Sequence, residues 1–423
     1  MAGAVLSSIA PRFRACLERS EGATWRAEVG RYVRNYNHYP APLPASKEYV
    51  MSKRTSSYLS RFCAIIPLAG LLFGVSMEAR AAGDTFLGGL KTVATVASTV
   101  PANGDVNPYG VARVRATIGN LHAGHILVSN FNDSSNAQGT GTTIMDVAPD
   151  GSVSVFAQIN PATLPGPCPG GVGLTTALVV LQTGWVIVGS LPTADGTSAT
   201  AQAGCLLVLD NSGKVVETFS GDPINGPWDM TVLDLDLRVV LFFTNVLNGT
   251  VAAGGNVANQ GTVVRMLLGV STRKMPSVIS TTVVGSGFAE RTDPDALVVG
   301  PTGVGLDRTG ALYVADTVND RIAVIPRALF HSDSAGTGLD VSTGGSLNGP
   351  LGLAIAPNGD IVTVNAGDGN IVETTPAGDQ VATKSIDSSG SPPGAGALFG
   401  LAIQGHQGIY FVDDATNTLN LLH

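Results

Sequence analysis

One phrase of strands and turns recurs along most of this chain, and such a repeat strongly limits the folds that the chain can adopt. The clearest copy is 301–325, PTGVGLDRTGALYVADTVNDRIAVI. Two short apolar runs flank the turn 308–310, and a third run follows the polar break 317–320. Apolar runs of this length, separated by short polar or glycine-containing turns, predict three antiparallel strands of one small sheet.

Six copies of the phrase can be aligned. Their openings are Pro108-Tyr109-Gly110-Val111, Gly170-Gly171-Val172, Pro227-Trp228-Asp229-Met230, Pro301-Thr302-Gly303-Val304, Pro350-Leu351-Gly352-Leu353 and Leu398-Phe399-Gly400-Leu401. The second strand of each copy ends in a small polar residue, and these are Asn130, Ser190, Asn245, Asp316, Asn365 and Asp413. A single sheet cannot bury both of its faces, so the pattern predicts an all-β fold, a six-bladed β-propeller of four-stranded antiparallel blades.

The last copy lacks an outer strand, because the chain ends at LNLLH. The segment 90–99, LKTVATVAST, has the character of the outer strands of the other copies. We therefore expect this N-terminal strand to complete the last blade and close the ring, which would remove an open sheet edge.

The phrase 300–325 resembles an NHL repeat, and 350–378 resembles a weaker second copy. The resemblance implies a six-bladed NHL-type propeller of the secreted bacterial type over roughly residues 84–423. It also implies that Asp316 and Arg321 stabilise the turn of their own blade. The motif is specific for the fold and says almost nothing about function.

The N-terminal residues have the pattern of a leader. Lys53, Arg54 and Arg61 precede the apolar stretch 63–77, and Ala79-Arg80-Ala81 follows as a small-x-small cleavage site. This is typical of a signal peptide over 51–81, with 82–423 as the mature propeller. Residues 1–50 are then either a mis-assigned start or a disordered extension. We expect a periplasmic or secreted protein without a membrane span in the mature chain.

Charge separates the leader from the mature chain. The whole chain has a net charge of -8, whereas the residues from Ala82 onward hold 13 Lys and Arg against 27 Asp and Glu. Binding to a phosphate backbone needs clustered basic side chains. The acidic mature chain therefore argues against a nucleic-acid partner.

Two cysteines remain once the leader is removed, Cys168 and Cys205. Both fall in the second copy, and an oxidising compartment would let them pair. A Cys168–Cys205 disulfide is one interpretation, and two buried thiols are the other.

The connections between second and third strands are long in the first three copies only, at 131–141, 191–204 and 246–261. In a propeller these loops share one face with the connections between blades, of which 160–170 and 286–300 are long. Loops on a rigid scaffold commonly carry function. We expect a lip on blades 1–3 that binds a small polar ligand, a glycan or a protein, although the loops could equally be tolerated insertions.

The other candidate site is the mouth of the central channel. Asp229 stands where the other aligned openings have glycine, and Trp228 lies beside it. By symmetry we expect them near Asn130, Asn245, Asn365 and Asp413. Carboxylate and amide oxygens suit Ca²⁺, for which Asp229, Asn245 and Asn365 are the predicted ligands. Six-bladed lactonases, which resemble this outline, hold Ca²⁺ in the channel, but no matching glutamate follows the N-terminal strand here.

No G-x-S-x-G elbow, H-E-x-x-H or phosphate-binding loop occurs in the sequence. The sequence therefore favours a binding module that acts through the loops of blades 1–3, with no cofactor required. The alternative is a Ca²⁺-dependent lactonase-like hydrolase or lyase with its site in the channel.

Overall fold

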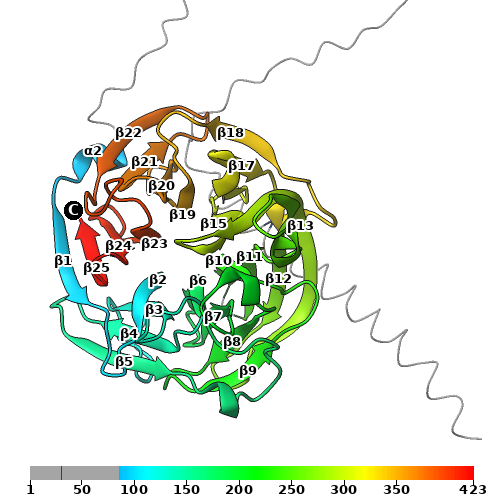
Figure 1. Cartoon of the computed structure of the whole chain (residues 1–423). Coiled ribbons are helices and arrows are strands. Elements are labelled where there is room, and N and C mark those ends of the chain that lie inside the picture. The colour runs from blue at the N-terminus through cyan, green and yellow to red at the C-terminus, as the bar shows by residue number, and fades with distance from the viewer. Residues whose placement is uncertain (1–29, 31–84, 236) are drawn as a thin grey trace, which may run out of the picture.

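A computed structural model describes residues 30, 85–235 and 237–423 of the chain. Its strands form six antiparallel sheets that stand around one axis, and the chain passes from sheet to sheet in sequence order (Figure 1). The predicted all-β, six-bladed propeller is therefore confirmed. The predicted extension 1–50 and signal peptide 51–81 lie outside the described residues, apart from residue 30. No helix in the described part of the chain is long and apolar enough to cross a membrane.

The strands of each blade are numbered here from the axis outward. Blade 1 holds β2 (Val106–Arg113), β3 (Ile126–Asn132), β4 (Thr143–Val147) and β5 (Val153–Gln158). Blade 2 holds β6 (Leu174–Val180), β7 (Val186–Ser190), β8 (Cys205–Leu209) and β9 (Val215–Phe219). Blade 3 holds β10 (Pro227–Leu235), β11 (Arg238–Asn245), β12 (Ala258–Gly269), β13 (Ser277–Asp293) and an additional fifth strand, β14 (Leu297–Val299).

The second half of the ring is more regular. Blade 4 holds β15 (Pro301–Leu306), β16 (Leu312–Asp316), β17 (Arg321–Ile325) and β18 (Leu339–Thr343). Blade 5 holds β19 (Pro350–Ile355), β20 (Ile361–Asn365), β21 (Asn370–Thr374) and β22 (Gln380–Ser385). Blade 6 holds β23 (Leu398–Ile403), β24 (Ile409–Asp413), β25 (Thr418–Leu422) and β1 (Val93–Ser98). The short helices are α2 (Phe86–Gly89), α3 (Thr250–Ala253) and the 3₁₀ turns Pro161–Thr163, Ser198–Thr200, Thr317–Asn319 and Ala328–Phe330.

The N-terminal strand closes the ring. β1 runs antiparallel to β25, with Val93 opposite Leu422, and forms the outer edge of blade 6 (Figure 1). The preceding helix α2 is fixed to blade 5, because the buried carboxylate of Glu373 accepts the backbone N–H groups of Phe86 and Leu87 at 2.8 and 2.7 Å. Both ends of the propeller are therefore held in one continuous structure.

The repeat turns form as the sequence predicts. In blade 4 the Asp307 carboxylate accepts the N–H groups of Thr309 and Ala311 at 2.9 and 2.8 Å, and Gly310 supplies the positive φ of 84°. In the next turn Arg321 pairs with the fully buried Asp316 at 2.7 Å. These contacts give Asp316 and Arg321 the structural place that the resemblance implies.

Glycines on the innermost strands let neighbouring blades approach closely. A Cβ on Gly303 would overlap the backbone oxygen of Leu351 in the next blade. In blade 3 the equivalent position belongs to Asp229, whose carboxylate accepts the N–H of Val304 in blade 4 at 3.1 Å. A hydrogen bond between blades therefore replaces the close backbone contact at this one junction.

The predicted opening of blade 2 was wrong by four residues. Leu174 pairs with Ser190 as Pro301 pairs with Asp316 in blade 4, so Leu174, and not Gly170, corresponds to the opening proline. The glycine run 170–173 belongs to the preceding loop. Since β6 contains no glycine, Asp229 is not the sole departure from the repeat pattern.

Candidate functional site

The three asparagines predicted at the channel mouth are fully buried, and each binds the segment that enters its own blade. Their Nδ2 atoms donate to backbone oxygens: Asn130 to Thr99 at 2.9 Å, Asn245 to Pro223 at 3.0 Å and Asn365 to Ser346 at 2.8 Å. The same polar position of the repeat thus fastens three connections between blades.

Asp413 and Trp228 take different places. The buried carboxylate of Asp413 accepts the N–H of Thr416 at 3.1 Å, and burial together with the nearby Asp387 raises its pKa. Trp228 is buried at the mouth of the channel, where its indole N–H donates to the backbone oxygen of Val298 at 3.1 Å. Neither side chain makes a contact that brings the predicted set together.

Asp229 is buried between blades 3 and 4. Its carboxylate accepts the N–H of Met230 at 2.8 Å and of Val304 at 3.1 Å. Burial nevertheless raises the pKa of Asp229 to about 8. This shift is the one expected of a carboxyl removed from water without a cationic neighbour.

The predicted calcium ligands do not share one coordination sphere. Thr244 donates to the backbone oxygen of Thr302 at 2.8 Å, so Thr244 and Asp229 both face blade 4. Successive strand residues point to opposite faces, and Asn245 accordingly binds the loop from blade 2. Asp229, Asn245 and Asn365 therefore do not fit a single Ca²⁺. Within 85–235 and 237–423, no three His, Cys, Asp or Glu side chains are grouped to hold a metal ion.

Aromatic side chains fill the channel mouth instead. The ring of Tyr109 stacks on Phe399 at a centroid distance of 3.8 Å and on Phe131 at 4.4 Å. Trp228 lies 6.3 Å from both Tyr109 and Phe399. These four rings come from blades 1, 3 and 6, and Leu351 of blade 5 belongs to the same buried cluster. We refer to the four rings as the aromatic plug.

A hairpin from blade 3 covers the plug. β13 extends to Asp293, and β14 returns beside it, with Asp293 opposite Leu297. Residues 296–299 are buried in the same cluster as the plug, and the oxygen of Val298 accepts the indole N–H of Trp228. The long connection predicted at 286–300 is therefore an ordered cover on the axis rather than a free rim.

Two of the predicted lip loops support each other. The hydroxyl of Thr193 in loop 191–204 donates to the backbone oxygen of Gln138 in loop 131–141 at 2.6 Å. Leu191 is buried. These contacts give loop 191–204 a place in the packing of the face.

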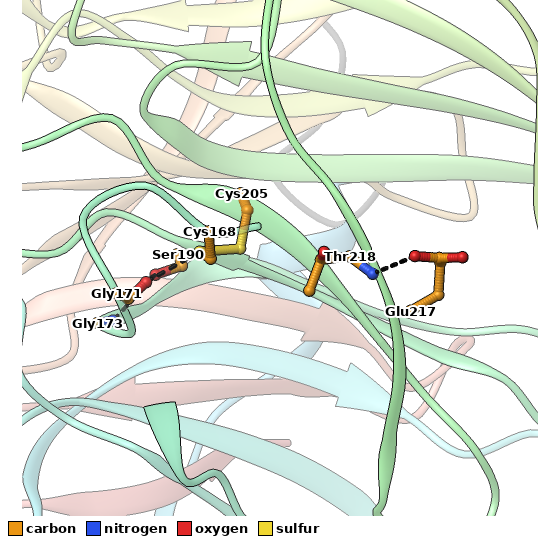
Figure 2. The surroundings of a disulfide bond; sticks show 7 residues. All are labelled: Cys168, Gly171, Gly173, Ser190, Cys205, Glu217 and Thr218. Carbon is orange, nitrogen blue, oxygen red and sulfur yellow. Dashed lines mark hydrogen bonds between the residues drawn. A yellow bond between two sulfur atoms is a disulfide. The ribbon is translucent and has the colours of Figure 1, made fainter. Parts of the chain in front are cut away.

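The disulfide anchors the start of blade 2. Cys168 and Cys205 are joined across 37 positions of sequence, and the Ser190 hydroxyl beside them accepts the N–H of Gly173 and donates to the oxygen of Gly171, both at 3.0 Å (Figure 2). The structure thus adopts the paired interpretation of the two cysteines.

The described face with the long loops also holds a pocket of about 610 Å³. It lies away from the axis, between blade 6, blade 1 and the tip of the blade 3 hairpin. Its wall consists of Val106, Asn107, Asn132, Ser134, Asn136, Gln138, Pro294, Asp295, Ala395, Gly396, Asp414, Ala415 and Asn417. A volume of this size is typical of sites for small organic molecules.

Acidic side chains dominate the electrostatics of the pocket. Burial raises the pKa of Asp414 to about 7, and Asp413, Asp295 and Asp387 raise it further in that order of importance. No Lys, Arg or His lies among its lining residues. Negative charge is therefore concentrated here without a basic partner in the wall.

Three amide side chains in the wall keep an unused acceptor. The side-chain oxygens of Asn107, Asn132 and Gln138 are buried and have no hydrogen-bond partner among the described residues. Asn107 is 6% exposed and Asn132 is 2% exposed. A buried acceptor without a donor costs about 1–3 kcal/mol, so such a group calls for an explanation.

Sequence reasoning missed most of this pocket. Loop 131–141 was predicted correctly as part of the functional face, but Asp295, Asp414 and Asn417 were not among the predicted site residues. One usable signal was the asparagines that occupy positive φ in the wall, Asn107 at 60°, Asn136 at 62° and Asn417 at 53°. Asparagine tolerates this conformation, but the sequence does not show where it occurs.

The fold and the site together define a six-bladed β-propeller with a filled axis and an acidic pocket beside it. No family model and no curated protein matches the chain, so membership of the NHL family stays a prediction. Solved structures with the same kind of fold include a gluconolactonase from Xanthomonas campestris, which is 12% identical and has a TM-score of 0.48 over 78% of this chain and 88% of that chain.

Two further similar structures carry other names. A streptogramin B lyase is 13% identical, with a TM-score of 0.46 over 78% of this chain and 97% of the lyase. A PQQ-bound aldose sugar dehydrogenase from Streptomyces coelicolor is 15% identical, with a TM-score of 0.46 over the same shares of the two chains. At these identities the likeness is one of fold, and no activity follows from it for this chain.

Proposed function

We propose that this protein is a secreted or periplasmic binding module that holds a small polar ligand in the pocket between blades 1 and 6. The observation that carries the proposal is the wall itself, in which buried side-chain oxygens lack a partner and line a volume of about 610 Å³. Buried polar atoms are nearly always hydrogen-bonded in folded proteins. A ligand that brings donors would satisfy them.

The proposal moves the binding site away from the lip of blades 1–3. Of the three long loops there, only 131–141 lines the pocket. Loop 191–204 is part of the packing, because Leu191 is buried and Thr193 binds Gln138. Deleting that loop would therefore test the stability of the fold and not the recognition of a ligand.

The alternative of a Ca²⁺-dependent hydrolase in the channel has no contact in its favour. Its predicted ligands Asp229 and Asn245 face opposite sides of blade 3. The aromatic plug and the hairpin 286–300 cover the mouth through which a substrate would enter. The binding role is accordingly the function that the geometry supports best.

Ala415→Trp tests the proposal, because Ala415 is exposed and lines the pocket, so that the indole can fill it. Ala377→Trp is the matched control, since Ala377 is exposed on a turn at the opposite end of its blade. Isothermal titration should measure glucose, glycerol, glycine, 1,4-diaminobutane and 1,4-butanediol. We expect at least one compound to bind the wild type and the control, and to bind Ala415→Trp at least about tenfold more weakly. Binding to none of the five, or equal binding to all three proteins, would refute the proposal.

A further inference from the structure

We infer that the ligand of this pocket is a protonated organic amine, whose N–H groups donate to the wall and whose positive charge lies between Asp295 and Asp414. The inference rests on the proposed binding function and names its ligand class. It follows from three properties of the wall: which hydrogen-bonding groups remain unused, where the charges lie, and how much space is enclosed.

The unused groups are acceptors. Asn132 spends its Nδ2 on the side-chain oxygen of Asn136 at 2.7 Å, and Gln138 spends its Nε2 on the backbone oxygen of Pro294 at 2.7 Å. Their own oxygens, like that of Asn107, remain without a described donor. A ligand that matches this wall must therefore bring donors rather than acceptors.

The charges are carboxylates without a counter-charge. Asp414 follows the last residue of β24 in blade 6, whereas Asp295 lies at the tip of the blade 3 hairpin. No described residue donates a hydrogen bond to either side-chain carboxylate. Asp295 is nevertheless close enough to Asp414 to oppose its ionisation, as are Asp413 and Asp387. A cation between the two carboxylates would relieve this repulsion.

An ammonium group meets both requirements at once, because it supplies three N–H donors and a positive charge. Hydrogen bonds from such a cation to carboxylates are about twice as strong as neutral ones. A neutral polyol would bring donors but leave the repulsion in place. A bare Ca²⁺ would satisfy the charge, yet the wall encloses about 610 Å³ and groups no three carboxylates for a metal ion.

The test compares 1,4-diaminobutane with 1,4-butanediol, which has the same chain length without charge, and with glucose and calcium chloride. The full mature chain is titrated calorimetrically with each compound near pH 8 and at low salt, where the alkylamine stays protonated. We expect the diamine to bind at least about tenfold more tightly than the diol or glucose. Asp414→Asn and Asp295→Asn keep the shape of the side chains, and each should weaken the diamine by about tenfold without changing the affinity for the diol.

Asp379→Asn is the matched control for net charge, since Asp379 is exposed on a turn of blade 5 away from the pocket. It should leave the affinity for the diamine unchanged. If glucose or butanediol binds at the pocket and the diamine does not, the binding module stands and the amine inference is overturned. Calcium binding without diamine binding also overturns it. An equal effect of Asp379→Asn and Asp414→Asn would show general charge attraction and overturn the assigned place.

Discussion

Breaking the Cys168–Cys205 disulfide should lower the free energy of unfolding by about 4 kcal/mol at 25 °C. The bond spans 37 positions of sequence, and a cross-link removes more entropy from the unfolded chain as the closed loop becomes longer. The folded state should change little, because the N–H of Gly170 donates to the oxygen of Ala203 at 2.9 Å and Ser190 binds the same loop on both sides.

Urea unfolding followed by tryptophan fluorescence measures this effect in three samples: oxidised wild type, reduced wild type and Cys168→Ser. The substitution is placed at Cys168 because Cys205 is fully buried in the core. With a urea dependence of about 3 kcal/mol per molar, the midpoint should fall by about 1 M in both samples without the bond. Coincident midpoints for oxidised and reduced wild type would refute the entropy argument. A midpoint for Cys168→Ser well below that of reduced wild type would assign the effect to packing.

Two further predictions concern the contacts between blades. Gly303→Ala should destabilise the fold by about 1–3 kcal/mol, because the new methyl group would overlap the oxygen of Leu351, whereas Gly89→Ala, with nothing within 4 Å, should be neutral or stabilising; equal urea midpoints would contradict this. Because burial raises the pKa of Asp229 to about 8, the folded state keeps a proton that the unfolded chain releases, and the free energy of unfolding should fall by about 1.4 kcal/mol per pH unit between the unfolded and folded pKa values. Asp229→Asn should remove that slope from pH-dependent unfolding curves, and parallel curves would disprove it.

The fold could be predicted because its determinants are local. Each turn depends on residues close in sequence, as when Asp307 binds the N–H groups of Thr309 and Ala311. Six such units have a single way of covering each other's faces, and the edge left open in blade 6 matched the segment 90–99. The error in blade 2 arose because the glycines 170–173 imitate an opening that the pairing of Leu174 with Ser190 places later.

The candidate site could not be predicted in the same way, because symmetry suggested a shared centre that the side chains do not use. Asn130 and Asn245 occupy the same repeat position, but each has a backbone oxygen of its own within reach. What occupies the axis depends instead on the residue before the repeat glycine, as in Tyr109 and Phe399, and on a hairpin inserted elsewhere in the chain. No local pattern reports that combination.

The filled axis leaves the junction where the ring closes as the place for a ligand. The segment that crosses from β1 to β2 is fastened there to blade 6, since Thr99 and Asn107 donate their N–H groups to Asn417 at 2.9 and 2.7 Å. The pocket wall combines that segment with the loop after β24 and the hairpin of blade 3. These parts meet only in the closed ring, so a bound ligand selects the folded state, and at a hundredfold excess over its dissociation constant it should stabilise that state by about 2.7 kcal/mol.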